Sequence, residues 1–128
     1  MNHQNKTHNI LVVEDDLDIR EIIVDDLESR DFNVFEASDG KEALQILSTE
    51  SFEFLVTDLI MPEEDGLVLI RKVRIAYPNL RIIAVSGGSK FMEGSYLNVA
   101  TTMGADRALE KPLRPGIVSQ TITELLAS

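Results

Sequence analysis

The chain has 128 residues, of which 44% are hydrophobic, and no cysteine, so it suits one domain with its own core and excludes disulfides and thiolate metal sites. Its net charge is −10 and its basic residues are scattered, which argues against direct nucleic-acid binding because that usually needs a basic stripe. No apolar run could span a membrane and the polar residues 1–8 are not a signal peptide, so we predict a soluble, cytoplasmic domain over residues 9–128 behind a polar lead-in.

Short apolar runs alternate with amphipathic stretches from residue 9 onward. The apolar runs predict strands over residues 9–13, 33–37, 52–57, 81–85 and 106–109. The amphipathic stretches predict helices over residues 16–30, from a cap at Ser38 or Asp39 through Leu47, from Leu67 to a stop before Pro78, from Gly94 or Ser95 to a Gly104 cap, and from near Pro115 through Leu126.

The predicted order is a strand followed by a helix, five times over. Strands joined by helices of this length run parallel with right-handed crossovers, and five units are too few for an eight-stranded barrel. We therefore predict an α/β fold of the (βα)5, flavodoxin-like type, an open doubly wound five-stranded parallel sheet with helices on both faces. Such sheets bind ligands at the carboxyl ends of the strands, near the switch in strand order.

Charged and hydroxyl side chains stand at the ends of four predicted strands. Glu14 and Asp15 follow the first, Asp58 the third, Ser86 the fourth and Lys111 the fifth. Carboxylates crowded at one sheet edge repel one another, and a divalent cation relieves that repulsion. Magnesium takes oxygen ligands and is often held by one or two carboxylates plus phosphate oxygens. The edge therefore suits a doubly anionic group attached to, or beside, one carboxylate.

Each of these residues also has an ordinary structural explanation. Acids after a strand often cap the next helix, as we expect of Asp16, and a Lys-Pro pair before a helix is often only a loop. A helix cap does not explain why apolar residues follow Asp58. The whole set, placed at strand ends of one fold, favours a site.

The ordered motifs resemble the receiver domain of two-component response regulators over nearly the whole chain, from about residue 9 onward. The segments that carry the resemblance are V-V-E-D-D at residues 12–16, T-D-L-I-M-P at 57–62, D-G at 65–66, V-S at 85–86, G-A-D at 104–106 and E-K-P at 110–112. The D-x-x-M-P segment with a later Lys-Pro is the most specific part.

The resemblance implies a role for each matching residue. Asp58 corresponds to the phosphoacceptor, Lys111 to the lysine that pairs with the phosphoryl oxygens, and Ser86 to the hydroxyl that follows the phosphoryl group on activation. The family's cis Lys-Pro bond implies a cis peptide between Lys111 and Pro112.

The implied metal is Mg2+, for which Mn2+ or Ca2+ could substitute in a crystal. Asp15 corresponds to the main metal-binding acid, with Asp58 as a second ligand and Glu14 beside it, acting directly or through a bound water. Ile60 matches the position whose backbone carbonyl completes the metal site.

The resemblance also implies partners. A sensor histidine kinase or a histidine phosphotransferase would donate the phosphoryl group, and an unidentified downstream protein would read the result. The chain would be no enzyme beyond self-catalysed phosphoryl transfer and slow autodephosphorylation, and a monomer or weak dimer. Because no output domain follows Ser128 in this sequence, we expect readout by contact through the fourth helix, fifth strand and fifth helix.

Three other functions stay open from the sequence. A phosphorelay shuttle would pass the group from Asp58 to another histidine protein. A magnesium-dependent phosphohydrolase would use Asp16 and Asp18, although these acids begin a helix and no cap domain for a substrate is present. A receiver-like domain that never takes phosphate is disfavoured because Asp15, Asp58, Ser86 and Lys111 are intact.

Three positions depart from the family pattern. Ala108 stands where an aromatic rotamer switch is usual, so coupling through a ring cannot operate, and Glu14 replaces the commoner Asp. Residues 86–95 contain three glycines, and we expect a mobile loop there. Its Phe91 and Met92, like Tyr96 just after it, pack on the core or form a partner face. We interpret His3 and His8 as exposed histidines of the lead-in.

Overall fold

The computed structural model describes residues 8–60, 66–87 and 95–128, over which strands and helices alternate. The strands are β1 (Asn9–Val13), β2 (Asn33–Ala37), β3 (Phe54–Asp58), β4 (Arg81–Gly87) and β5 (Arg107–Lys111). The helices are α1 (Leu17–Glu28), α2 (Gly40–Thr49), α3 (Gly66–Ala76), α4 (Ser95–Met103) and α5 (Ile117–Ala127).

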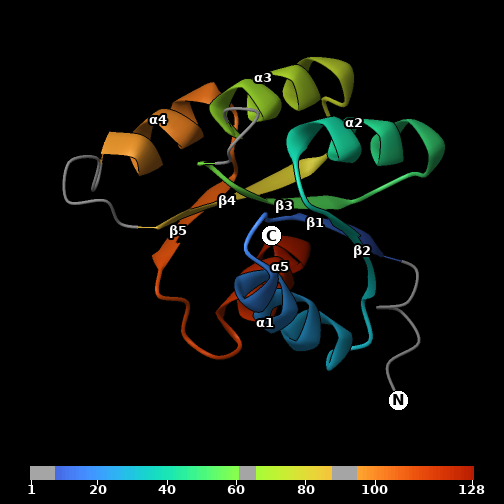
Figure 1. The fold of residues 1–128 in the computed structure, drawn as a ribbon, viewed down its shortest axis with the longest axis vertical. Helices are drawn as coiled ribbons and strands as arrows, with labels where there is room; N and C mark the ends of the chain where they lie inside the picture. Colours follow the sequence, from blue (N-terminus) through green and yellow to red (C-terminus); the bar gives the residue numbers. More distant parts are fainter. Residues whose placement is uncertain (1–7, 61–65, 88–94) are drawn as a thin grey trace.

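The strands form one parallel sheet in the order β2-β1-β3-β4-β5, which confirms the predicted open (βα)5 fold. Helices α1 and α5 cover one face, and α2, α3 and α4 cover the other (Figure 1). The chain reverses its direction of travel across the sheet between β1 and β3. The carboxyl ends of these two strands are therefore the expected ligand site of a doubly wound sheet.

Alternation of side chains along each strand divides the core into two layers. Residues such as Val12, Val56 and Val85 pack against α1 and α5. Their strand neighbours, such as Val13 and Leu55, pack against α2, α3 and α4. Because successive strand side chains point to opposite faces, this division fixes the side to which each residue at a strand end belongs.

The helix ends largely follow the predicted caps. Asp16 accepts from the backbone N–H groups of Asp18 and Ile19 at the start of α1. Asp39, one of the two predicted caps, accepts from Glu42 N–H at the start of α2. After α4, Gly104 has a positive φ of 126°, a conformation that favours glycine, so the predicted C-terminal cap is also confirmed. No helix in the described residues is long and apolar enough to cross a membrane.

Several strand limits differ from the prediction. β3 begins at Phe54 and not at residue 52, because pairing with β1 and β4 starts there. β4 and β5 continue together to Gly87 and Lys111, beyond the predicted ends. Asp106 was predicted to open the fifth strand, but it precedes β5 and its carboxylate accepts from Ile82 N–H at 2.8 Å.

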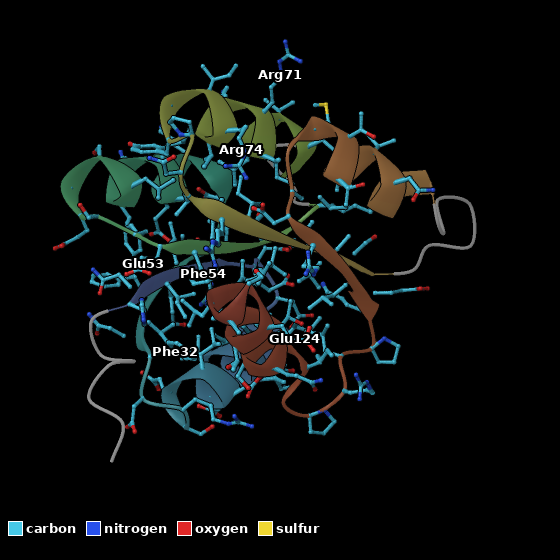
Figure 2. All side chains as sticks on the ribbon, turned by 180° about the vertical axis from the view of Figure 1, so that it is seen from behind. Phe32, Glu53, Phe54, Arg71, Arg74 and Glu124 are labelled. Carbon is cyan, nitrogen blue, oxygen red and sulfur yellow. The ribbon has the colours of Figure 1, made fainter. Side chains whose placement is uncertain are left out.

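Arg74 on α3 forms hydrogen bonds to the segment before β4 and to the segment between α4 and β5. Its guanidinium donates to Gly104 O at 2.6 Å, to Leu80 O at 2.6 Å and to the Asp106 carboxylate at 3.0 Å. Figure 2 shows Arg74 between α3 and the sheet, whereas Arg71 extends away from the domain. The planar fork of donors suits this position because several carbonyls converge there.

The interpretation of His8 as an exposed histidine is wrong. Its imidazole Nδ1 lies 2.5 Å from a Glu53 carboxylate oxygen, the side chain is 21% exposed, and the ring lies beside Phe32. His8 is held here by its backbone, because its carbonyl oxygen accepts a hydrogen bond from Asn33 N–H and so continues the pairing of β1 with β2. His3 and the glycine-rich stretch at 88–94, with Phe91 and Met92, lie outside the described residues, as does the side chain of Tyr96.

Candidate metal and phosphoacceptor site

Three charged side chains converge at the carboxyl edge of the sheet. Glu14 follows β1, Asp58 ends β3 and Lys111 ends β5, and alternation assigns all three to the α1/α5 side. Lys111 Nζ lies 2.8 Å from Glu14 Oε1 and 3.3 Å from Asp58 Oδ2. Residues far apart in the sequence thus form one ionic cluster, as their positions at strand ends predicted.

Burial sets the electrostatics of this cluster. Glu14 is 1% exposed and Asp58 6%. Burial, reinforced by the charge of Asp58, raises the pKa of Glu14 from 4.5 to about 7 against the opposing hydrogen bond from Lys111. Burial alone would lower the pKa of Lys111, but its hydrogen bond to Glu14 and the charge of Asp58 outweigh it, and the pKa rises above 10.5. When both carboxylates are ionised, the cluster holds two negative charges against one ammonium.

Asp15 completes a group with the chemistry of a hard-cation site. Carboxylate oxygens of Glu14, Asp15 and Asp58 lie within 4.8 Å of one another. Asp15 is exposed, so the group opens to solvent on one side, while Glu14 and Asp58 form its buried floor. An all-oxygen set that is partly open fits Mg2+, which keeps several waters and takes one or two carboxylates.

The backbone after Asp58 is held tightly against the sheet. Leu59 N–H donates to Val85 O at 3.0 Å, and Ile60 N–H donates to Asp58 Oδ1 at 3.2 Å. Gly66 N–H then returns to Leu59 O at 2.9 Å, so that α3 begins directly over the end of β3. These bonds fix the direction of the Asp58 carboxylate.

Ser86 lies near this cluster but belongs to the other face of the sheet. It is 5% exposed, and its strand neighbour Val85 is paired in register with Asp58. Because Val85 packs toward α1 and α5, alternation turns Ser86 toward α2, α3 and α4. Lys111 and Ser86 thus flank the end of β3 from opposite sides.

Two features of β5 near Lys111 follow what the sequence implied, the peptide bond after it and the small residue at position 108. The peptide bond between Lys111 and Pro112 is cis, as the resemblance implied. Ala108 is half-buried, pairs in register with Ala84 and packs with the α2–α4 core. No ring occupies that position, in agreement with the departure noted from the sequence.

Sequence reasoning missed two residues that shape the site. Arg20 on α1 donates to the carbonyl oxygen of Glu14 at 3.0 Å, and Gly66 lies against the backbone of Asp58. Arg20 is one turn after the Asp16 cap, a spacing that places its side chain near the strand end. The D-G pair at 65–66 marked a turn but gave no sign of how closely the backbones approach.

Comparisons with known proteins identify the family and the fold of the chain. The family described as "Response regulator receiver domain" matches residues 10–123. The "Response regulator receiver protein CpdR" of Brucella abortus is 38% identical over 78 residues, which cover 61% of this chain and 65% of CpdR. A CheY-like receiver domain protein from Methanospirillum hungatei has a crystal structure with a TM-score of 0.85 at 27% identity, covering 94% of both chains.

A response regulator from Burkholderia pseudomallei was crystallised with a phosphorylated aspartic acid, a calcium ion and citrate. Its structure has a TM-score of 0.78 at 28% identity, over 94% of this chain and 71% of that one. The chain spans 65% of the length of CpdR, and 12% and 44% of two other curated relatives.

Proposed function

The chain belongs to the response regulator receiver domain family, and from this membership we propose that Asp58 accepts a phosphoryl group beside a magnesium ion. Receiver domains are phosphoacceptor signalling domains and not classical enzymes, and they generally bind Mg2+ at an acidic pocket. The observation that carries the proposal is the contact of Lys111 with both Glu14 and Asp58, next to a group of three carboxylates.

The proposed metal ligands are the carboxylates of Asp15 and Asp58, the backbone carbonyl of Ile60, and Glu14 directly or through water. A bound Mg2+ would neutralise charge on the transferring phosphoryl group. Burial, together with the charge of Asp58, raises the pKa of Glu14 to about 7, so a bound cation would favour the ionised form of Glu14. The calcium ion of the Burkholderia pseudomallei response regulator supports a cation site of this kind.

The transfer itself needs positioning and charge more than covalent help. An oxygen of Asp58 forms a bond to phosphorus while the bond from phosphorus to the donor imidazole nitrogen breaks, and the imidazole leaves with the electron pair. Lys111, already 3.3 Å from Asp58 Oδ2, would pair with the phosphoryl oxygens. Ser86, on the other side of β3, would donate to a second phosphoryl oxygen and draw the end of β4 toward it.

The proposed donor is a sensor histidine kinase or a histidine phosphotransferase, and the proposed reader is a separate downstream protein. Phosphorylation adds charge and strong acceptors, which would bias a surface that already samples two states. A relay role, in which Asp58 passes the group to another histidine protein, is tested by mixing the phosphorylated chain with candidate phosphotransferases. Return of phosphate to a histidine would favour the relay.

The decisive experiment is incubation with acetyl phosphate and Mg2+, followed by intact mass measurement. We expect the mass of one added phosphoryl group in the wild type, none in Asp58→Asn, and none in the wild type with EDTA. Asp16→Asn is a matched control, because Asp16 caps α1 at the same edge and should leave labelling intact.

Two outcomes would contradict the proposal. Failure of the folded wild type to take up phosphate or beryllofluoride would remove the phosphoacceptor role. Multiple turnover of generic phosphate esters that survives Asp58→Asn but is lost in Asp16→Asn would favour the hydrolase instead.

A further inference from the structure

Arg20 connects the candidate site to the edge of the sheet. It lies in the first turns of α1, and its side chain is 17% exposed. Its Nη1 donates to the carbonyl oxygen of Glu14 at 3.0 Å, and its Nε donates to a carboxylate oxygen of Glu36 on β2 at 3.1 Å. One planar guanidinium therefore bridges the end of β1, the start of α1 and the edge strand.

The peptide group that Arg20 holds is the one between the two acids. The carbonyl of Glu14 belongs to the Glu14–Asp15 peptide. The preceding peptide is also held, because Glu14 N–H donates to Ala37 O at 3.1 Å. Asp15 is exposed. The orientation of the Glu14–Asp15 peptide plane sets where the Asp15 side chain leaves the backbone, and therefore its direction relative to Asp58.

Resting on the proposed function above, we propose that Arg20 is a positioning residue that sets Asp15 and Glu14 for Mg2+. Its hydrogen bonds go to a backbone carbonyl and to Glu36, so it would act on the metal through Glu14 and Asp15 and not as a ligand. Mutation of a residue that orients metal ligands from behind typically lowers metal affinity by about 10- to 100-fold. The bond to Glu36 is the weaker of its two contacts, because the Glu36 side chain is 47% exposed.

Charge and positioning make opposite predictions for Arg20. A guanidinium near an acidic cluster repels a cation, so its removal by charge alone would tighten Mg2+ binding. Removal of a positioning bond would weaken it. The sign of the change in Mg2+ affinity therefore separates the two explanations. If Arg20 served folding alone, a variant that is as stable as the wild type would bind Mg2+ with unchanged affinity.

The experiment is a Mg2+ titration of the full 128-residue chain by amide NMR shifts, with a thermal melt of each variant. Arg20→Met keeps the packing of the side chain and removes its donors, and we expect the Mg2+ Kd to rise about tenfold. Arg20→Lys keeps the charge with a shorter single donor, so its Kd should fall between those of Arg20→Met and the wild type. Glu36→Gln, the matched control, keeps the bond to Glu14 and should change Kd by less than about twofold.

The phosphorylation rate gives a second readout. With acetyl phosphate, the Mg2+ concentration for half-maximal rate should rise in Arg20→Met, while the rate at saturating Mg2+ stays near that of the wild type. Unchanged or tighter Mg2+ binding in folded Arg20→Met would overturn the inference. If that variant does not fold, a wild-type Kd in Arg20→Lys would overturn it equally. Absence of Mg2+ binding by the wild type would instead reject the proposed function itself.

Discussion

Gly66 offers a sharp test of how the site is built. It is the first residue of α3, and a Cβ at this position would overlap the carbonyl oxygen of Asp58 and lie 2.5 Å from the Cα of Leu59. Both neighbours are backbone atoms, at the end of β3 and directly after it, so no side chain can swing aside. Gly66→Ala must therefore move α3 away from the end of β3.

Two opposing energies decide whether this substitution raises or lowers the free energy of unfolding. Alanine in a helix gains up to about 1 kcal/mol over glycine, and this gain is smaller at a helix start. Overpacking of a well-packed site typically costs about 1–3 kcal/mol, and the rigid backbone at Gly66 favours the upper part of that range. We expect Gly66→Ala to lower the free energy of unfolding by about 2 kcal/mol, or about 4 °C in Tm for each kcal/mol in a domain of this size.

Urea unfolding followed by circular dichroism measures this loss, and Gly87→Ala is the matched control. Gly87 also stands at a strand end beside the site, but among the described residues its added Cβ would meet only the Lys111 Cδ, at an ordinary 3.4 Å. Gly87→Ala should therefore stay within about 0.5 kcal/mol of the wild type. A Gly66→Ala protein as stable as the wild type, with unchanged Mg2+ affinity, would refute the close approach of α3 to Asp58.

Three further predictions concern stability and pH. The raised pKa of Glu14 means that the folded protein holds this proton more tightly than the unfolded chain. In EDTA, the free energy of unfolding should therefore fall as pH rises from 4.5 to about 7. Glu14→Gln should flatten that slope when stability is measured by urea titration at several pH values. Asp26→Ala should cost about 1–2 kcal/mol because its carboxylate caps α5 through Ser119 N–H at 3.0 Å, whereas the exposed neighbour Asp25→Ala should change little in the same assay. Arg74→Lys should cost about 2 kcal/mol by thermal melt, since an ammonium cannot reach all the carbonyls that the guanidinium binds, and a wild-type Tm would contradict this.

The fold followed from the sequence because its signals are local and repeated. Each strand is a short apolar run, each helix has an apolar face, and the connections are too long for hairpins. The same reasoning brought Glu14, Asp58 and Lys111 together, since parallel strands end at one edge. Their mutual contact then follows from alternation, because all three have the parity of the α1/α5 layer.

The sequence could not predict individual side-chain contacts between elements, because these contacts depend on how the elements pack and not on the hydrophobic pattern within each one. The bond from Arg20 to the Glu14 carbonyl depends on the angle at which α1 leaves β1, and the cap of α5 by Asp26 depends on how α1 and α5 lie side by side. The pairing of His8 with Glu53 was missed for a similar reason, because a polar residue before a strand looks like a lead-in until the sheet edge is known. Pattern fixes which face a residue occupies, but packing decides which partner it meets.

Ala108 shows how a departure from the family pattern limits the mechanism. Its neighbour Ala84 in β4 and the fully buried Ala100 on α4 are small residues of the same core layer. Alanine has no rotamer to change, so position 108 itself cannot hold two side-chain states. If Asp58 takes a phosphoryl group as proposed, the direct route toward α4 would be the end of β4 at Ser86 and Gly87, which lies between Asp58 and Lys111 in the sheet. Under the proposed function, the step after phosphorylation would then depend on the end of β4, and element ends are where sequence patterns carry the least information.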